Sequence, residues 1–116
     1  PIVVSWLTTT VLFSQSKIDS LLTQLPNSAG KERVSVLSAL CSEYAYINAD
    51  SARLFGIEAL QLVGTEPTGI RAQILYGIAI THQVQSNYDE ALKYNEEGLT
   101  IYKSLNDSLR IADLLN

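Results

Sequence analysis

The stretch that decides the fold is residues 75–99, LYGIAITHQVQSNYDEALKYNEEGL. Apolar residues recur at helical spacing up to Val84, and they resume at Ala91 after a polar break. Asn87 suits the N-cap of the second helix, and Glu90 follows three positions later, as in a capping box. Asp89 adds negative charge at the positive end of the helix dipole. The stretch therefore predicts two helices joined by a tight turn.

The same helical periodicity continues outward through the chain. A short leading helix is expected over residues 16–27, where Pro26 stops it. Apolar stripes follow over residues 28–46 and 52–63, and Gly64-Thr65-Glu66-Pro67 predicts a turn with Pro67 early in the next helix. A last turn is expected at residues 105–107. Helices of about 14–18 residues joined by short loops are typical of antiparallel helix pairs. The predicted class is all-α.

The sequence also matches itself at an offset of 39 residues. Ala52 falls on Ala91 and Ala59 on Gly98, so small residues coincide at helical spacing. The other coincidences are Phe55 on Tyr94, Glu58 on Glu97, Leu60 on Leu99, Leu62 on Ile101, Ile70 on Leu109, Arg71 on Arg110 and Leu75 on Leu114. Alternating small and large residues are what stacked helix pairs need, because each repeat leaves an apolar face that its neighbour covers.

These residues resemble the tetratricopeptide repeat family, most closely over SNYDEALKYNEEGL (86–99). His82 and Asn95 depart from the pattern at positions where the family has aromatic residues. The positions that fit are Leu75, Ile78, Ala79, Tyr88, Ala91 and Gly98, and an upstream copy holds Leu37, Leu40, Cys41, Tyr44, Ala52, Ala59 and Leu60. The resemblance implies a right-handed α-solenoid of about two and a half repeats, over residues 28–64, 65–105 and a partial 106–116.

The resemblance also implies a function as a non-catalytic protein–protein interaction module. The spacing near 39 and the leading helix are similar to the sensor regions of Bacteroidetes-type two-component histidine kinases, in which a repeat array precedes a membrane anchor and a kinase. Two alternatives stay open. The chain is either a stand-alone adaptor or scaffold, or the regulatory arm of an enzyme whose catalytic domain lies elsewhere.

Residues 1–15 have two interpretations. Residues 2–13 carry no charge and are too short to span a bilayer, and small polar residues follow them, as in a secretory signal peptide. This interpretation favours an extracytoplasmic, periplasmic location, with any membrane contact outside these 116 residues. In the other interpretation the segment is an additional helix or strand packed on the domain, and the location is cytoplasmic. Its β-branched residues suit a strand.

Composition excludes several functional classes. Twelve acidic against eight basic residues give a net charge of −4, which argues against nucleic acid as a partner. A single cysteine and a single histidine provide neither a disulfide nor a cluster of metal ligands. His82 is expected to be a packed, hydrogen-bonded core residue and Cys41 an inert buried thiol. We therefore expect no catalytic residues, no metal and no cofactor.

The expected partner is a protein or peptide. The inner positions of the tetratricopeptide motif fall on Ser35, Ser38, Ser42, Tyr46, Gln73, Tyr76, Ile80 and Gln83. These positions lack the Lys, Arg and Asn residues with which some family members hold a carboxylate, so a neutral extended peptide is favoured. The alternative is that this wall packs on other parts of a larger protein. Self-association is also expected, through the apolar residues Ile111, Leu114 and Leu115 or through residues 2–13.

Overall fold

The computed structural model describes the backbone of residues 2–115 and the side chains of residues 13–108. Over this backbone the chain is all-α, as expected, and no strand occurs between residues 2 and 115. The elements are α1 (Ile2–Gln24), a 3-10 turn (Leu25–Asn27), α2 (Gly30–Tyr44), α3 (Ala49–Val63), α4 (Gly69–Val84) and α5 (Tyr88–Leu115).

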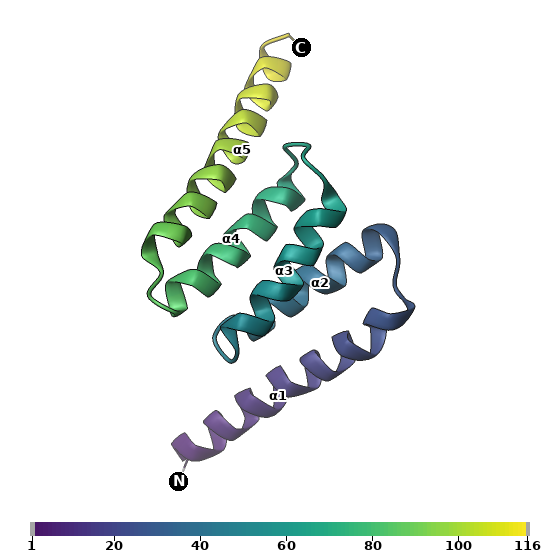
Figure 1. Ribbon diagram of the computed structural model, residues 1–116, viewed down its shortest axis with the longest axis vertical. Helices are drawn as coiled ribbons and strands as arrows, with labels where there is room; N and C mark the ends of the chain where they lie inside the picture. Colours follow the sequence, from purple (N-terminus) through teal and green to yellow (C-terminus); the bar gives the residue numbers. More distant parts are fainter. Residues whose placement is uncertain (1, 116) are drawn as a thin grey trace.

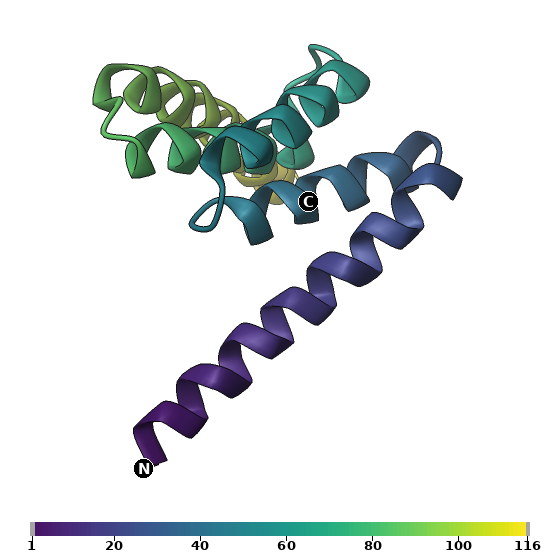
Figure 2. The same ribbon diagram turned by 60° about the horizontal axis from the view of Figure 1, so that its bottom comes forward.

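Each helix packs mainly on the helix before it and the helix after it. In Figure 1, α3 and α4 follow α2 in order, and α5 lies antiparallel to α4 at the edge of the array. Helix α1 contacts α2 through its C-terminal part, where Ile18 is buried, and its N-terminal part points away from the other helices (Figure 2). Helix α2 also touches α4, so these two line the same side of the array.

The offset found in the sequence recurs in the structure. Helices α2 and α4 begin at residues 30 and 69, and α3 and α5 begin at residues 49 and 88, so both starts repeat after 39 residues. The small residues of the repeat are buried, namely Ala52, Ala59, Ala91 and Gly98. The large apolar positions of the first helices, Leu37, Leu40, Leu75 and Ile78, are also buried. The fold is therefore a repeat-like arrangement of helices.

Glycine allows the closest approach between helices. A Cβ placed on Gly56 in α3 would lie 2.8 Å from Cγ1 of Ile78 in α4 and 3.0 Å from Sγ of Cys41 in α2. Both distances are shorter than ordinary van der Waals contact, so α2 and α4 can reach this side of α3 only because position 56 has no side chain. In α5, a Cβ on Gly98 would lie 3.3 Å from the backbone oxygen of Ala72.

Local sequence signals set where the helices begin and end. The Asn48 side chain accepts a hydrogen bond from the Ser51 amide, and Thr68 accepts one from the Arg71 amide, so both residues are N-caps. Gly64 ends α3 with a φ of 73°, a conformation that favours glycine. Pro67 precedes the N-cap of α4 instead of lying inside the helix, so the expectation for Pro67 was wrong by two residues.

Two expected boundaries are absent from the backbone. Residues 2–24 form one continuous helix, so the strand considered for residues 1–15 does not form, and no break separates them from residues 16–27. The turn expected at 105–107 is also absent, because α5 runs through to Leu115. Residues 2–24 and residues 105–107 contain neither Gly nor Pro, and Asn106 and Asp107 are exposed. Nothing in these two stretches therefore forces a helix to end. The proposed partial repeat 106–116 thus begins without a turn.

Candidate functional site

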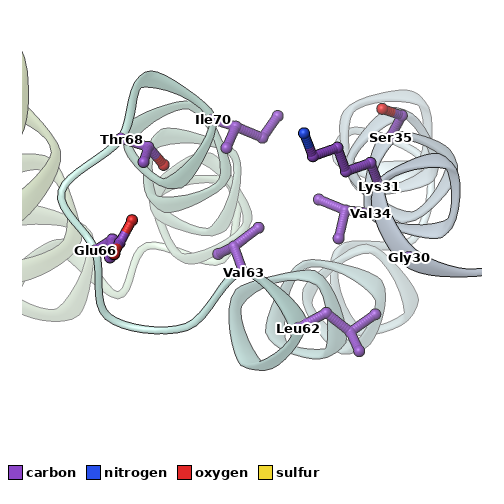
Figure 3. Close-up of a pocket in the computed structure, with 9 residues that line it drawn as sticks. All are labelled: Gly30, Lys31, Val34, Ser35, Leu62, Val63, Glu66, Thr68 and Ile70. Carbon is purple, nitrogen blue, oxygen red and sulfur yellow. The ribbon is translucent and has the colours of Figure 1, made fainter.

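A hollow of about 620 Å³ lies where the first turns of α2, the end of α3 and the loop into α4 meet. Figure 3 shows Lys31 and Val34 pointing inward from α2, toward Ile70 of α4 and Val63 of α3. The residues that line this hollow are Gly30, Lys31, Val34, Ser35, Leu62, Val63, Glu66, Thr68 and Ile70. Its interior is mainly aliphatic, and polar groups stand at its rim.

A second, shallower hollow of about 180 Å³ adjoins the first. It shares Ser35 and Ile70 with the larger hollow, so the two form one continuous groove between α2 and α4. Its lining residues are Ser35, Ser38, Ala39, Ser42, Ile70 and Gln73. We call the two hollows together the α2–α4 groove. One end of the groove is aliphatic, and the other end carries hydroxyl and amide groups.

The charges at the rim of the groove balance one another. Lys31 stands on the α2 side and Glu66 on the loop side. Among residues 13–108, neither side chain forms an ion pair, although Arg33 and Arg71 close by are both paired. The groove therefore presents one cation and one anion to a ligand, and it has no net preference for charge.

Four of the eight expected groove residues lie together. Ser35, Ser38, Ser42 and Gln73 all line the shallower hollow, and Ser38 is the most buried of its three serines. They come from α2 and α4, which the sequence assigned to the inner wall. The structure therefore brings this half of the expected set to one site.

The other four expected residues lie elsewhere. Tyr76 faces α5, where its ring stacks on Tyr102 with centroids 5.6 Å apart. Ile80 packs on the cluster that contains Cys41, Ala45 and Ala52. Tyr46 is exposed in the turn after α2, and Gln83 is exposed in the last turn of α4; neither lines the groove.

The aliphatic end of the groove was not expected from the sequence. Val34, Val63 and Ile70 belong to the apolar stripes of their helices, which are expected to pack in the core. The hollow forms at the helix ends instead, where the first turns of α2, the end of α3 and the five-residue loop 64–68 meet. Its signal in the sequence is the Gly64–Pro67 turn between two apolar stripes.

His82 is half-buried and stacks on Tyr94, with ring centroids 5.5 Å apart. Its Nδ1 atom is buried and has no hydrogen-bond partner among residues 13–108, so the expectation of a hydrogen-bonded histidine was wrong for this atom. Burial and the Arg53 cation lower the pKa of His82, and Glu90 opposes them. The neutral imidazole is therefore the favoured form near neutral pH.

Cys41 lies at the crossing of α2, α3 and α4. Burial raises the pKa of its thiol to about 11, although a backbone hydrogen bond at Gly56 opposes the shift. Since the thiolate is the nucleophilic form, this thiol is poorly suited to covalent chemistry. Within the described residues, no three of the His, Cys, Asp and Glu side chains gather as metal ligands.

Comparisons with known proteins add no further identification. No protein family model matches the sequence, and no curated protein or solved structure is significantly similar to it. Among the helices of residues 2–115, none combines the length and apolar character needed to cross a bilayer.

Proposed function

We propose that this chain is a non-catalytic protein–protein interaction module of the tetratricopeptide kind. Its helix pairs, α2–α3 and α4–α5, would stack as a right-handed α-solenoid. The constant offset between helix starts and the buried small residues at Ala52, Ala59, Ala91 and Gly98 support this proposal. In such an array the first helix of each pair lines the concave wall, which is where α2 and α4 form the groove.

The ligand that fits the groove is a neutral, extended segment of a partner protein. The continuity of the groove through Ser35 and Ile70 carries this conclusion, because it joins an aliphatic hollow to a row of hydrogen-bonding side chains. An extended backbone offers amide and carbonyl groups to Ser35, Ser42 and Gln73, and one aliphatic side chain would fill the larger hollow. The balanced pair of Lys31 and Glu66 fits a segment without net charge.

The length of the groove sets the length of the ligand. Gly30 and Ser42 mark its two ends along α2. At 1.5 Å per helical residue, they lie about 18 Å apart. An extended chain covers this distance with about five residues. The aliphatic residue of the ligand belongs at the Gly30 end, beside Val34 and Val63.

The wider context is also part of the proposal. We infer that the module is the sensor or scaffold region of a longer signalling protein, similar to the repeat regions of histidine kinases. A stand-alone adaptor and the regulatory arm of an enzyme are the alternatives. Reading the coding sequence on both sides distinguishes them. A membrane anchor followed by a kinase supports the sensor region, and an immediate stop codon supports the adaptor.

Peptide selection tests the groove. Neutral peptides of about ten residues from a display library are selected on the wild-type chain, and the enriched peptides are titrated against two variants. Ser35→Trp fills the junction of the two hollows, whereas Ser104→Trp places the same ring on an exposed position of α5. We expect enrichment of aliphatic residues and a loss of affinity of at least about tenfold in Ser35→Trp only.

Two outcomes would overturn the proposal. If Ser35→Trp binds the selected peptides as tightly as Ser104→Trp does, the ligand lies outside the groove. If no neutral peptide is enriched on the wild-type chain, the groove does not bind free segments. Packing against another part of a larger protein would then be the better account of this wall.

A further inference from the structure

Helix α5 carries a second apolar surface beside the one that packs on α4, and its last residue, Tyr102, also stacks on Tyr76 of α4. Tyr88, Leu92, Leu99 and Tyr102 are respectively 65%, 56%, 46% and 41% exposed. Their spacings of four, seven and three residues place them on one side of the helix, as in the a and d positions of a heptad. We call these four residues the α5 stripe. Asn95, which is half-buried, falls between Leu92 and Leu99 on the same side.

One repeat earlier, the matching positions are covered by the next helix. Leu99 and Tyr102 of α5 correspond to Leu60 and Val63 of α3. Leu60 packs against the α4 residues Ala72 and Leu75, and Val63 packs against the cluster containing Ile74 and Ile78. The repeat thus matches Leu99 and Tyr102 to positions that a neighbouring helix covers, whereas Tyr88 and Leu92 correspond to Ala49 and Arg53.

On α5 this neighbour is missing from the described residues. Residues 103–115 continue the helix in one direction past the first turn of α4 (Figure 1) and do not return over the stripe. Within residues 2–115, the stripe is left uncovered. A long helix with an exposed seam at heptad spacing is the usual element of a helix–helix interface.

We propose that a second copy of this chain covers the α5 stripe, with the two α5 helices packed antiparallel about a two-fold axis. In such an isologous contact each copy uses the same face, so a single apolar seam is sufficient. This places self-association on a face other than those expected from the sequence. The side chains of residues 2–12 and 109–116 lie outside the described residues.

The charges beside the stripe select the antiparallel direction. Asp89, Glu96 and Lys103 follow one another at intervals of seven residues, along one flank of the stripe. Asp89 and Lys103 are exposed, and neither forms an ion pair within residues 13–108. Antiparallel packing brings Asp89 of each copy to Lys103 of the other copy, whereas in a parallel pair this flank would face the opposite, uncharged flank of the other helix and form no ion pair. This arrangement has one unfavourable contact, because the two Glu96 carboxylates meet near the two-fold axis.

The first test is the oligomeric state of the full chain. Sedimentation equilibrium is measured from about 10 µM to about 1 mM, because a seam about 21 Å long gives a concentration-dependent dimer. We expect the wild-type chain to dimerise and Leu99→Glu to be monomeric. The matched control is Leu54→Glu, which adds the same charge at a 70% exposed position on α3 and should still dimerise. Helical circular dichroism verifies that both variants are folded.

The second test is a charge exchange across the axis. Lys103→Asp should weaken the dimer at least about tenfold, since it places two acidic pairs in the contact. Combining it with Asp89→Lys should restore the dimer, because both pairs are re-formed with their charges reversed. A wild-type monomer at about 1 mM, or a dimer that Leu99→Glu leaves intact, overturns the proposal. Failure of the double variant to restore the dimer overturns the antiparallel arrangement. Neither result bears on the proposal that the α2–α4 groove binds a peptide.

Discussion

Arg71 of α4 forms an ion pair with Glu97 of α5, with Nη2 2.9 Å from Oε1. Arg71 also donates a hydrogen bond to the carbonyl oxygen of Gly64 at the end of α3, so one side chain joins three successive helices. One repeat earlier, Arg33 of α2 holds Glu58 of α3 and the Leu25 carbonyl oxygen in the same way. The repeat therefore extends to the polar contacts between helices.

Removing this contact should lower the stability of the fold. Arg71→Met keeps much of the side-chain volume but leaves the Gly64 carbonyl oxygen without its hydrogen-bond donor. We expect the free energy of unfolding to fall by about 1–2 kcal/mol. The ion pair itself adds little, because the Glu97 side chain is half-exposed and solvent screens it. Urea unfolding followed by circular dichroism measures the change.

The matched control is Lys93→Met, which breaks the exposed pair between Lys93 and Glu90 on one helix. It should leave the unfolding midpoint unchanged, because exposed pairs within a helix contribute little. Equal losses in the two variants would mean that Arg71 does not join the helices in the way described.

Position 56 should not tolerate a side chain. Gly56→Ala forces a methyl group against Ile78 and Cys41, and overpacking of this kind costs about 1–3 kcal/mol. Gly69→Ala is the control, because a Cβ there meets nothing within 4 Å, and it should be neutral or slightly stabilising. Thermal unfolding compares the two. A Gly56→Ala variant as stable as the wild-type chain would show that α2, α3 and α4 do not pack this closely.

Acid should destabilise the chain through His82. The unfolded chain binds a proton near the usual pKa of 6.5, and the folded chain binds it only at lower pH, because burial and Arg53 lower the pKa of His82. The contribution of His82 to stability is thus complete above about pH 6.5 and is lost as the pH falls through the lowered value.

His82→Phe keeps a ring against Tyr94 and removes the proton. Urea midpoints measured from about pH 8 to about pH 5 should fall more steeply in the wild-type chain than in this variant. Identical pH profiles would contradict the burial described for the imidazole.

The Cys41 thiol should resist alkylation while the chain is folded. Burial and a pKa of about 11 keep the thiolate scarce and inaccessible near neutral pH. Iodoacetamide should therefore modify it only in denaturant, as measured by the mass of the intact chain. A Ser42→Cys variant adds an exposed thiol on the same helix and should react once under native conditions. Rapid modification of Cys41 in the folded wild-type chain would contradict the packing at the helix crossing.

Periodicity and capping made most of the helices predictable. Asn48, Gly64 and Asn87 lie at the helix ends where their local chemistry predicts them. The continuation of α5 through Asn106 and Asp107 was not predictable in this way, because both residues occur in turns and in exposed helical positions. Because no Gly or Pro is nearby, tertiary contacts decide whether these residues form a turn or continue the helix.

The groove was predictable only in part. The position of Ser35, Ser38, Ser42 and Gln73 beside one hollow follows from the inner face of their helices, which is a local property of the sequence. The contact of Tyr76 with Tyr102 was not predictable, because an aromatic residue suits a groove and a helix interface equally well and Tyr102 lies 26 residues away in the sequence. The aliphatic hollow depends on three elements at once, so no single helical pattern contains it.

The central claim is that the α2–α4 groove binds an extended segment, and methyl NMR tests it most directly. A peptide selected on the wild-type chain is titrated into protein with labelled Ile, Leu and Val methyl groups. The resonances of Val34, Val63 and Ile70 should shift together, while those of Leu92 and Leu99 on the α5 stripe should not. Shifts confined to α5, with the groove methyl groups unchanged, would contradict this claim.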